Sequence, residues 1–184
     1  MVNGNDEKLW FLVCGSECSG TKLIARIVSD AHKVRVITEW HGFGRVRRRN
    51  DDKVVVEHVS FPRQTLKDDV IDWLNIQEYV EMVKKEGYKL VVVIVLRDRS
   101  ISVFSKMNTW GESMKDCYGH FKKFRTVFEE LTSFNPVIIS YEGLLFLKGS
   151  YLNYYKKELM TDKDFKEYDS YIFDANNKYV KNAI

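Results

Sequence analysis

The residues best suited to chemistry lie in the segment GSECSGTK, residues 15–22, which follows an apolar run and precedes a helical pattern. Gly15 and Gly20 allow the positive φ angles and the close backbone approach that a phosphate group needs. The first N–H groups of a helix lack intrahelical partners, and the helix dipole adds partial positive charge there. Ser19 and Thr21 add hydroxyl donors. The segment therefore favours a phosphate-binding loop over an ordinary glycine turn.

The same segment departs from the Walker A loop that binds nucleoside triphosphates. In that loop a lysine follows the second glycine, and the next residue supplies a hydroxyl that binds Mg²⁺. Here Thr21 occupies the lysine position and Lys22 occupies the hydroxyl position. Because the magnesium ligand is missing, the sequence weighs against an ATPase or a GTPase.

A second candidate site begins where another apolar run, residues 90–96, ends at Arg97. A guanidinium fork suits a terminal phosphate, and the hydroxyl of Ser105, on the helix expected to follow, can share that phosphate. The alternative interpretation is that Arg97 and Asp98 only cap the strand and the helix. The segment gains weight because it is expected at the same end of the sheet as the glycine loop.

Three short motifs together resemble the sulfotransferase family. They are Ser19-Gly20-Thr21 in the glycine loop, Arg97 with Ser105 eight residues later, and Tyr141-Glu142-Gly143-Leu144 after the apolar residues 136–140. The resemblance implies a P-loop-type fold and transfer of a sulfuryl group from 3′-phosphoadenosine 5′-phosphosulfate (PAPS) to a hydroxyl or an amine, without a metal ion. The 5′-phosphosulfate would then be bound by Gly15, Cys18, Ser19, Gly20, Thr21 and Lys22. The 3′-phosphate would be bound by Arg97 and Ser105.

Cys18 departs from the family pattern. Sulfotransferases carry a lysine or an arginine at this place, and its charge stabilises the bridging oxygen of the leaving nucleotide. A thiol cannot supply a cation, so transfer would lose electrostatic stabilisation that is often worth several kcal/mol. Lys22 could reach back from the start of the helix to supply the charge, as could an arginine from another loop.

Transfer to a hydroxyl or an amine also requires a general base. Residues 54–61 predict a strand that carries Glu57 and His58 near its end. Adjacent strand residues face opposite ways, so only one of the two should point toward the site. His58 is favoured because the ordinary pKa of imidazole suits base chemistry near neutrality, although an ordinary strand histidine is the alternative. His41 is a further candidate.

The elements that position these residues follow from the hydrophobic pattern. Apolar runs typical of strands occur at residues 9–15, 34–38, 54–61, 90–96 and 136–140. Helical periodicity occurs at residues 22–32, 69–86 and 113–132, and a further helix is expected from Glu142 with a break near Gly149. The alternation predicts a three-layer α/β fold with a central, mostly parallel sheet of about five strands. In such a sheet ligands bind outside the carboxyl ends of the strands, where the candidate loops should meet.

Composition narrows the class of protein. The 184 residues suit one domain, residues 1–184, and the net charge of +3 is too small to indicate nucleic-acid binding. Three cysteines argue against a disulfide framework, and their spacing makes zinc unexpected. The polar N-terminus and the absence of a long apolar run favour a cytoplasmic location with no membrane partner. The run from Arg45 to Arg49 is either a solvated loop or a surface for an anionic acceptor.

Two other functions stay open. A nucleotide or nucleoside-phosphate kinase on the same architecture would need a lysine and a magnesium-binding hydroxyl in register, and the loop has neither. A non-catalytic nucleotide-binding module would keep the loop and lack the catalytic cation. Cys18 is the residue that favours the binding module.

Overall fold

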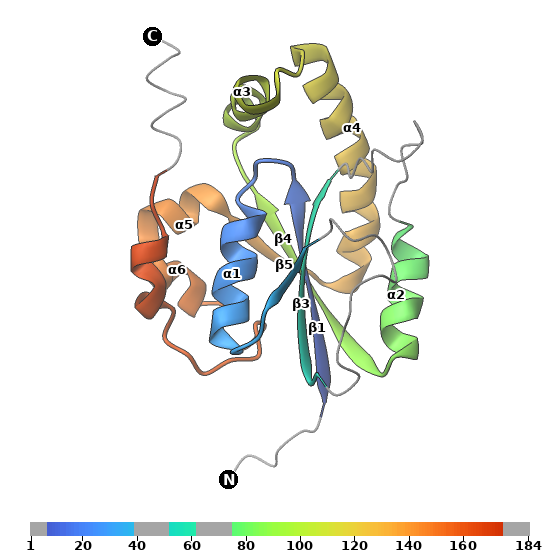
Figure 1. Cartoon of the computed structure of the whole chain (residues 1–184), viewed down its shortest axis with the longest axis vertical. Helices are drawn as coiled ribbons and strands as arrows, with labels where there is room; N and C mark the ends of the chain where they lie inside the picture. Colours follow the sequence, from blue (N-terminus) through green and yellow to red (C-terminus); the bar gives the residue numbers. More distant parts are fainter. Residues whose placement is uncertain (1–6, 39–51, 62–74, 175–184) are drawn as a thin grey trace.

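The computed structural model describes residues 7–38, 52–61 and 75–174, which form an α/β structure around one parallel sheet (Figure 1). The strands are β1 (Lys8–Ser16), β2 (Val36–Thr38), β3 (Val54–Phe61), β4 (Tyr88–Leu96) and β5 (Val137–Ser140). The body of the sheet has the order β3-β1-β4-β5, and the short β2 pairs with β3 at the edge. Every pairing among these strands is parallel. The predicted α/β class with a parallel sheet flanked by helices is confirmed.

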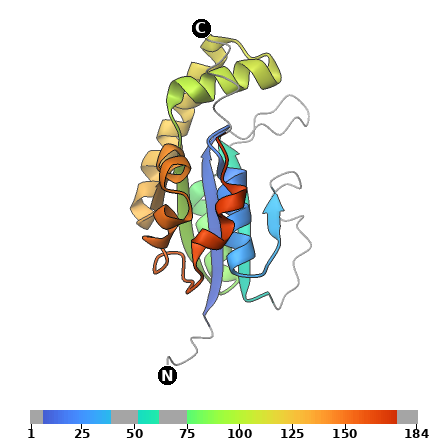
Figure 2. The ribbon, with the colours of Figure 1, turned by 90° about the vertical axis from the view of Figure 1, so that its left-hand side faces the viewer.

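Helices cover both faces of the sheet. One face carries α1 (Thr21–Ala31), α5 (Tyr141–Leu147), α6 (Gly149–Asn153) and the 3-10 helix η3 (Phe165–Tyr171). The other face carries α2 (Ile76–Lys85), α4 (Met114–Leu131) and the 3-10 helix η2 (Thr132–Phe134). Helix α3 (Arg99–Trp110) lies beyond the carboxyl ends of the strands (Figures 1 and 2). None of the described helices has the length and apolar character needed to cross a membrane.

The predicted element boundaries agree with the structure at most places. The patterns at residues 22–32 and 113–132 correspond to α1 and α4, and the expected break near Gly149 separates α5 from α6. The helix expected over residues 69–86 is observed from Ile76, and residues 69–74 lie outside the described part. The strand expected at residues 34–38 is shorter, because only Val36–Thr38 pairs with β3.

Side chains define where several helices begin. Asn75, Asp98, Ser113 and Ser140 accept hydrogen bonds from backbone N–H groups in the first turns of α2, α3, α4 and α5. Such caps satisfy donors that have no partner within the helix. Helix α1 begins differently, because its N-cap is Gly20 and no side chain caps its first turn. The positive end of the α1 dipole is therefore not offset by a capping or acidic side chain of that turn.

Strand β1 is buried on both faces. Leu9, Phe11 and Val13 join the core that contains α1, whereas Trp10, Leu12 and Cys14 join the core that contains α2 and α4. Because both faces are covered by helices, the strand reads as a nearly continuous apolar run and not as an alternating one.

The connections after β1 and β4 leave the sheet on opposite faces. Helix α1 follows β1 on one face, and α4, which lies on the connection from β4 to β5, packs on the other. These two strands are neighbours, with Gly15 level with Val95. A parallel sheet forms a ligand-binding crevice where adjacent strands diverge in this way. We call the region at the carboxyl ends of β1 and β4, where this rule expects a ligand, the crevice.

Gly149→Ala is expected to lower the free energy of unfolding by about 1–3 kcal/mol, because the added methyl group would overlap the backbone of Phe165. Gly119→Ala is the matched control, since Gly119 lies in α4 with open space around it and alanine favours a helix by roughly 0.5–1 kcal/mol. Urea unfolding measures both effects. Equal losses of stability in the two variants would contradict the close packing of η3 against α6.

Candidate functional site

The loop after β1 joins the sheet to α1 through two residues in the left-handed region. Cys18 has a φ of 63° and Gly20 has a φ of 92°. The Glu17 N–H donates to the Phe61 carbonyl oxygen at 2.9 Å, which fixes the loop to the end of β3. The Ser19 N–H donates to the Ser16 carbonyl oxygen at 3.1 Å. These bonds hold the loop in a tight turn that aims the start of α1 at the crevice.

Gly15 and Ser19 pack against each other beneath the loop. A Cβ atom on Gly15 would overlap the Val95 carbonyl oxygen and the Ser19 hydroxyl. Ser19 is 0% exposed, and within the described residues its hydroxyl has no hydrogen-bond partner. A buried hydroxyl without a partner is unfavourable. It is one donor at the loop that a bound anion could satisfy.

Tyr141 forms one wall of the site, and the sequence motif did not indicate this role. A Cβ atom on Gly20 would overlap the Tyr141 ring, so residue 20 must be glycine for steric reasons as well as for its φ angle. The Arg97 guanidinium also packs over the Tyr141 ring, 4.8 Å from the ring centre. The beginning of α5 thereby contacts both candidate segments.

Arg97 and Ser105, predicted to act together, both contact the glycine loop at Cys18. The Arg97 Nη1 donates to the Cys18 carbonyl oxygen at 2.6 Å. The Ser105 side chain forms a hydrogen bond with the Cys18 thiol. Arg97 follows β4 and Ser105 lies in α3, so the turn between these elements brings both side chains to one residue.

The Cys18 thiol is neutral in this environment. Burial is the main cause that raises its pKa above the ordinary value, and the hydrogen bond from Ser105 opposes this only in part. The side chain therefore supplies no negative charge to repel an anion, and no positive charge to stabilise one. Cys18 therefore leaves the loop without a charged side chain at the position where sulfotransferases carry a cation.

His58 lies behind the loop and contacts Thr21. Its Nε2 is 2.8 Å from the Thr21 Oγ1 and 3.2 Å from the Ser60 Oγ. His58 is 1% exposed and lies on the sheet face that α1 covers. The structure thus brings His58 to the site through the Thr21 hydroxyl, and not as a base that faces an acceptor.

The charge state of His58 agrees with this position. Burial lowers its pKa to about 4, and the nearby positive charge of Lys22 contributes to the shift. The imidazole is therefore neutral at physiological pH. Lys22 itself is exposed in the first turn of α1, where its ammonium group can move toward a ligand in the loop.

Glu57 lies on the opposite face of the sheet. Its Oε2 accepts a hydrogen bond from the Tyr79 hydroxyl at 2.6 Å, and the same hydroxyl accepts one from the Trp10 indole N–H at 2.6 Å. Burial and the Glu57 charge raise the pKa of Tyr79 well above its usual value. The structure does not bring Glu57 to the glycine loop, and its contacts connect β1, β3 and α2.

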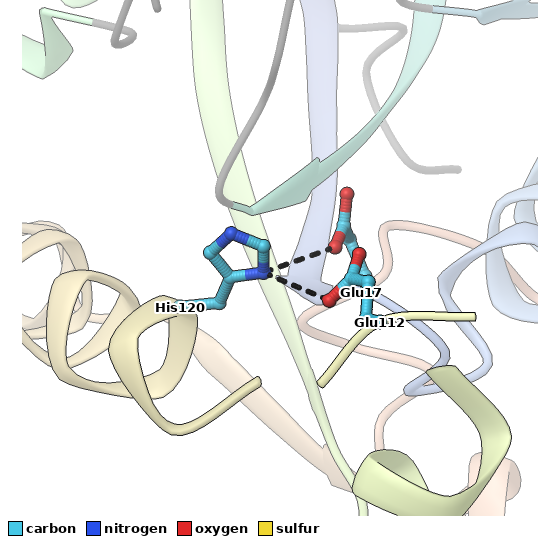
Figure 3. A group of neighbouring side chains, drawn as sticks. All are labelled: Glu17, Glu112 and His120. Carbon is cyan, nitrogen blue, oxygen red and sulfur yellow. Dashed lines mark ion pairs between the residues drawn. The ribbon is translucent and has the colours of Figure 1, made fainter. Parts of the chain in front are cut away.

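A buried polar cluster beside the loop escaped the sequence analysis. The Lys106 ammonium lies among Glu17, Glu112 and His120, and the last three are drawn in Figure 3. No local pattern could reveal the cluster, because its members come from the loop, α3, the α3–α4 connection and α4.

Two expectations fall outside the described residues. The run from Arg45 to Arg49 and His41 belong to residues 39–51, so the structure does not place the expected acceptor surface.

No model of a known protein family matches the chain, and the search of curated proteins found no match either. The resemblance to sulfotransferases therefore rests on the sequence motifs alone.

The low pKa of His58 predicts a pH-dependent component of stability. Because this pKa is about 4 and the ordinary value is 6.5, the unfolded chain binds a proton at higher pH than the folded protein does. The stabilisation is fully present above pH 6.5 and is lost as the pH falls toward 4. Between these limits the wild type should lose on the order of 2 kcal/mol more stability than His58→Gln does. Urea unfolding across this pH range measures the difference, and parallel curves would show that His58 titrates normally.

Proposed function

We propose that the protein binds PAPS in a P-loop-type site and transfers its sulfuryl group to a hydroxyl or an amine. The observation that carries the proposal is the convergence of two motif segments, 79 residues apart, on Cys18 through Arg97 and Ser105. The residue types and spacing in both segments independently favour phosphate binding. The loop would hold the 5′-phosphosulfate, and the Arg97 and Ser105 side chains would turn from Cys18 to the 3′-phosphate.

The beginning of α1 supports anion binding without a metal. No side chain caps its first turn, that turn contains no acidic residue, and the exposed Lys22 adds a positive charge. Lys22 occupies the position where a Walker A loop places its magnesium-binding hydroxyl. A kinase that depends on magnesium is therefore less well supported than a transferase that does not.

His58 is better suited to orient Thr21 than to deprotonate an acceptor. If the imidazole carries its proton on Nε2, it donates to the Thr21 oxygen and leaves the Thr21 hydroxyl proton free to point at an anion. The buried Nδ1, which has no hydrogen-bond partner within the described residues, then carries only a lone pair. In this arrangement His58 is a positioning residue for the phosphate loop.

During transfer, the acceptor atom would bond to sulfur and release its proton to solvent, while the bond from sulfur to the bridging phosphate oxygen breaks. Negative charge would collect on that oxygen, and a nearby cation would stabilise it. Lys22, exposed in the first turn of α1, is a side chain of the loop region that can supply this charge. The run from Arg45 to Arg49 remains the proposed surface for an anionic acceptor.

A non-catalytic nucleotide-binding module is the second candidate. The neutral thiol of Cys18 and the positions of His58 and Glu57, neither of which faces the crevice, favour it. Calorimetric titration with 3′-phosphoadenosine 5′-phosphate, PAPS and ATP, with and without Mg²⁺, tests what both candidates share. Tight binding of ATP alone, dependent on Mg²⁺, would exclude both. Sulfuryl transfer to a panel of acceptors then separates them.

Arg97→Ala should weaken binding of 3′-phosphoadenosine 5′-phosphate by roughly 10- to 100-fold, because a charge-assisted hydrogen bond to the 3′-phosphate is lost. Binding of adenosine 5′-phosphate should change much less, so selectivity for the 3′-phosphate disappears. Arg125→Ala is the control, since Arg125 is exposed on α4 and pairs with Glu129 one turn away. If selectivity survives in Arg97→Ala, the role assigned to Arg97 is wrong.

Cys18→Arg should raise the rate of sulfuryl transfer by about tenfold or more, because it restores a cation beside the bridging oxygen. Cys18→Ser is the uncharged control and should not accelerate transfer. Single-turnover measurements with PAPS and the best acceptor of the panel report the rate. Equal rates in the two variants would contradict the missing-cation argument and favour the binding module.

A further inference from the structure

Lys106 is a buried lysine whose ammonium group contacts polar side chains next to the loop. It lies in α3, is 2% exposed, and is surrounded by Glu17 of the loop, Glu112 of the α3–α4 connection and His120 of α4. Burying an ammonium group is unfavourable unless partners replace its water. Three polar side chains therefore replace water around the Lys106 ammonium.

The ammonium lies at the centre of its three partners. The Lys106 Nζ is 2.6 Å from the Glu17 Oε2, 3.1 Å from the Glu112 Oε2 and 2.6 Å from the His120 Nδ1. The contacts with the two carboxylates are ion pairs, and the contact with the His120 Nδ1 is a hydrogen bond.

The same three acceptors form a ligand set for a divalent metal ion. Their ligand atoms lie within 4.8 Å of one another, and Figure 3 shows the two carboxylates converging on the His120 Nδ1. Two carboxylate oxygens and one imidazole nitrogen suit Mn²⁺ or a similar ion. The Lys106 ammonium occupies the position between them where such an ion would lie.

We propose that Lys106 is a built-in cation that occupies a divalent-metal site made by Glu17, Glu112 and His120. It neutralises part of the carboxylate charge beside the glycine loop and so makes a metal ion unnecessary there. Removal of its charge should leave a site that binds a metal ion. The effect of Lys106 on ligand binding rests on the proposed function. The proposal that Lys106 fills a metal site, called the filled site, does not.

The position of Lys106 explains why its charge matters to the loop. Glu17 and Cys18 are adjacent in the loop, and they contact Lys106 and Ser105, which are adjacent in α3. The two contacts dock α3 on the loop side by side. Without the ammonium, the two carboxylates would repel each other and would also repel an anion bound in the loop.

Titration with Mn²⁺, followed by the electron paramagnetic resonance signal of the free ion, tests the filled site without any nucleotide. Lys106→Met should bind one Mn²⁺ about 100-fold more tightly than the wild type does. The double variant Lys106→Met with His120→Ala should lose this binding. Lys122→Met, which removes an exposed charge of α4, should behave as the wild type does. Equal Mn²⁺ binding by the wild type and Lys106→Met would overturn the proposal.

Thermal unfolding with and without Mn²⁺ covers the case in which Lys106→Met folds poorly. The proposal predicts that Mn²⁺ raises the Tm of Lys106→Met, and of the more conservative Lys106→Gln, while the wild type is unchanged. If Mn²⁺ stabilises neither variant, the three side chains do not form a metal site and the proposal is wrong.

The consequence for the loop is tested with 3′-phosphoadenosine 5′-phosphate. Lys106→Met should bind this nucleotide at least about tenfold more weakly than the wild type, and Mn²⁺ should restore the affinity. Failure of Mn²⁺ to restore binding, when Mn²⁺ itself binds the variant, would overturn the link to the loop. If the wild type does not bind the nucleotide at all, the proposed function fails, and the Mn²⁺ titration still decides the filled site.

Discussion

The position of β1 between two parallel neighbours is the constraint on which the site depends. It pairs with β3 on one edge and with β4 on the other, and both of its faces are buried. A strand held on four sides cannot shift its register without exposing its apolar residues. The chain must therefore leave the sheet after Ser16, level with the ends of β3 and β4. The contacts of the loop with Phe61 and Arg97 follow from that exit point.

The charges around the loop come from separate elements, which affects the proposed binding and the proposed transfer differently. Arg97 follows β4, Lys22 lies in α1 and Lys106 lies in α3, while the loop itself carries a neutral thiol at Cys18. Positive charge that surrounds a loop can hold an anion in place. Stabilising a transition state needs the charge at the reacting atom, before the reaction begins. For the proposed function, the arrangement thus supports anion binding better than it supports sulfuryl transfer.

The fold was predictable because local patterns dominate it. The apolar run at residues 9–15 and the helical stripe at residues 113–132 are each decided by burial within one element, and β1 and α4 form where expected. The alternation in β3 also correctly predicts that Glu57 and His58 face opposite ways.

The sequence could not show how deeply a side chain lies or what meets it from elsewhere. His58 faces the expected side of the sheet, yet α1 covers it, and no pattern within β3 reveals that cover. Glu17 is distant along the chain from Lys106, Glu112 and His120. Their meeting depends on how α3 turns over the ends of the strands, which is set by tertiary packing and not by local periodicity.

The contact between Gly20 and the Tyr141 ring links two distant positions of the chain. Since the ring fills the space where a Cβ atom at residue 20 would lie, the two residues share one fixed volume. Among natural relatives, a larger residue at position 20 would require a smaller one at position 141, and the support that Arg97 draws from the ring would be lost with it. The pair should therefore change together in evolution, and their covariation would record the close approach of α5 to the loop.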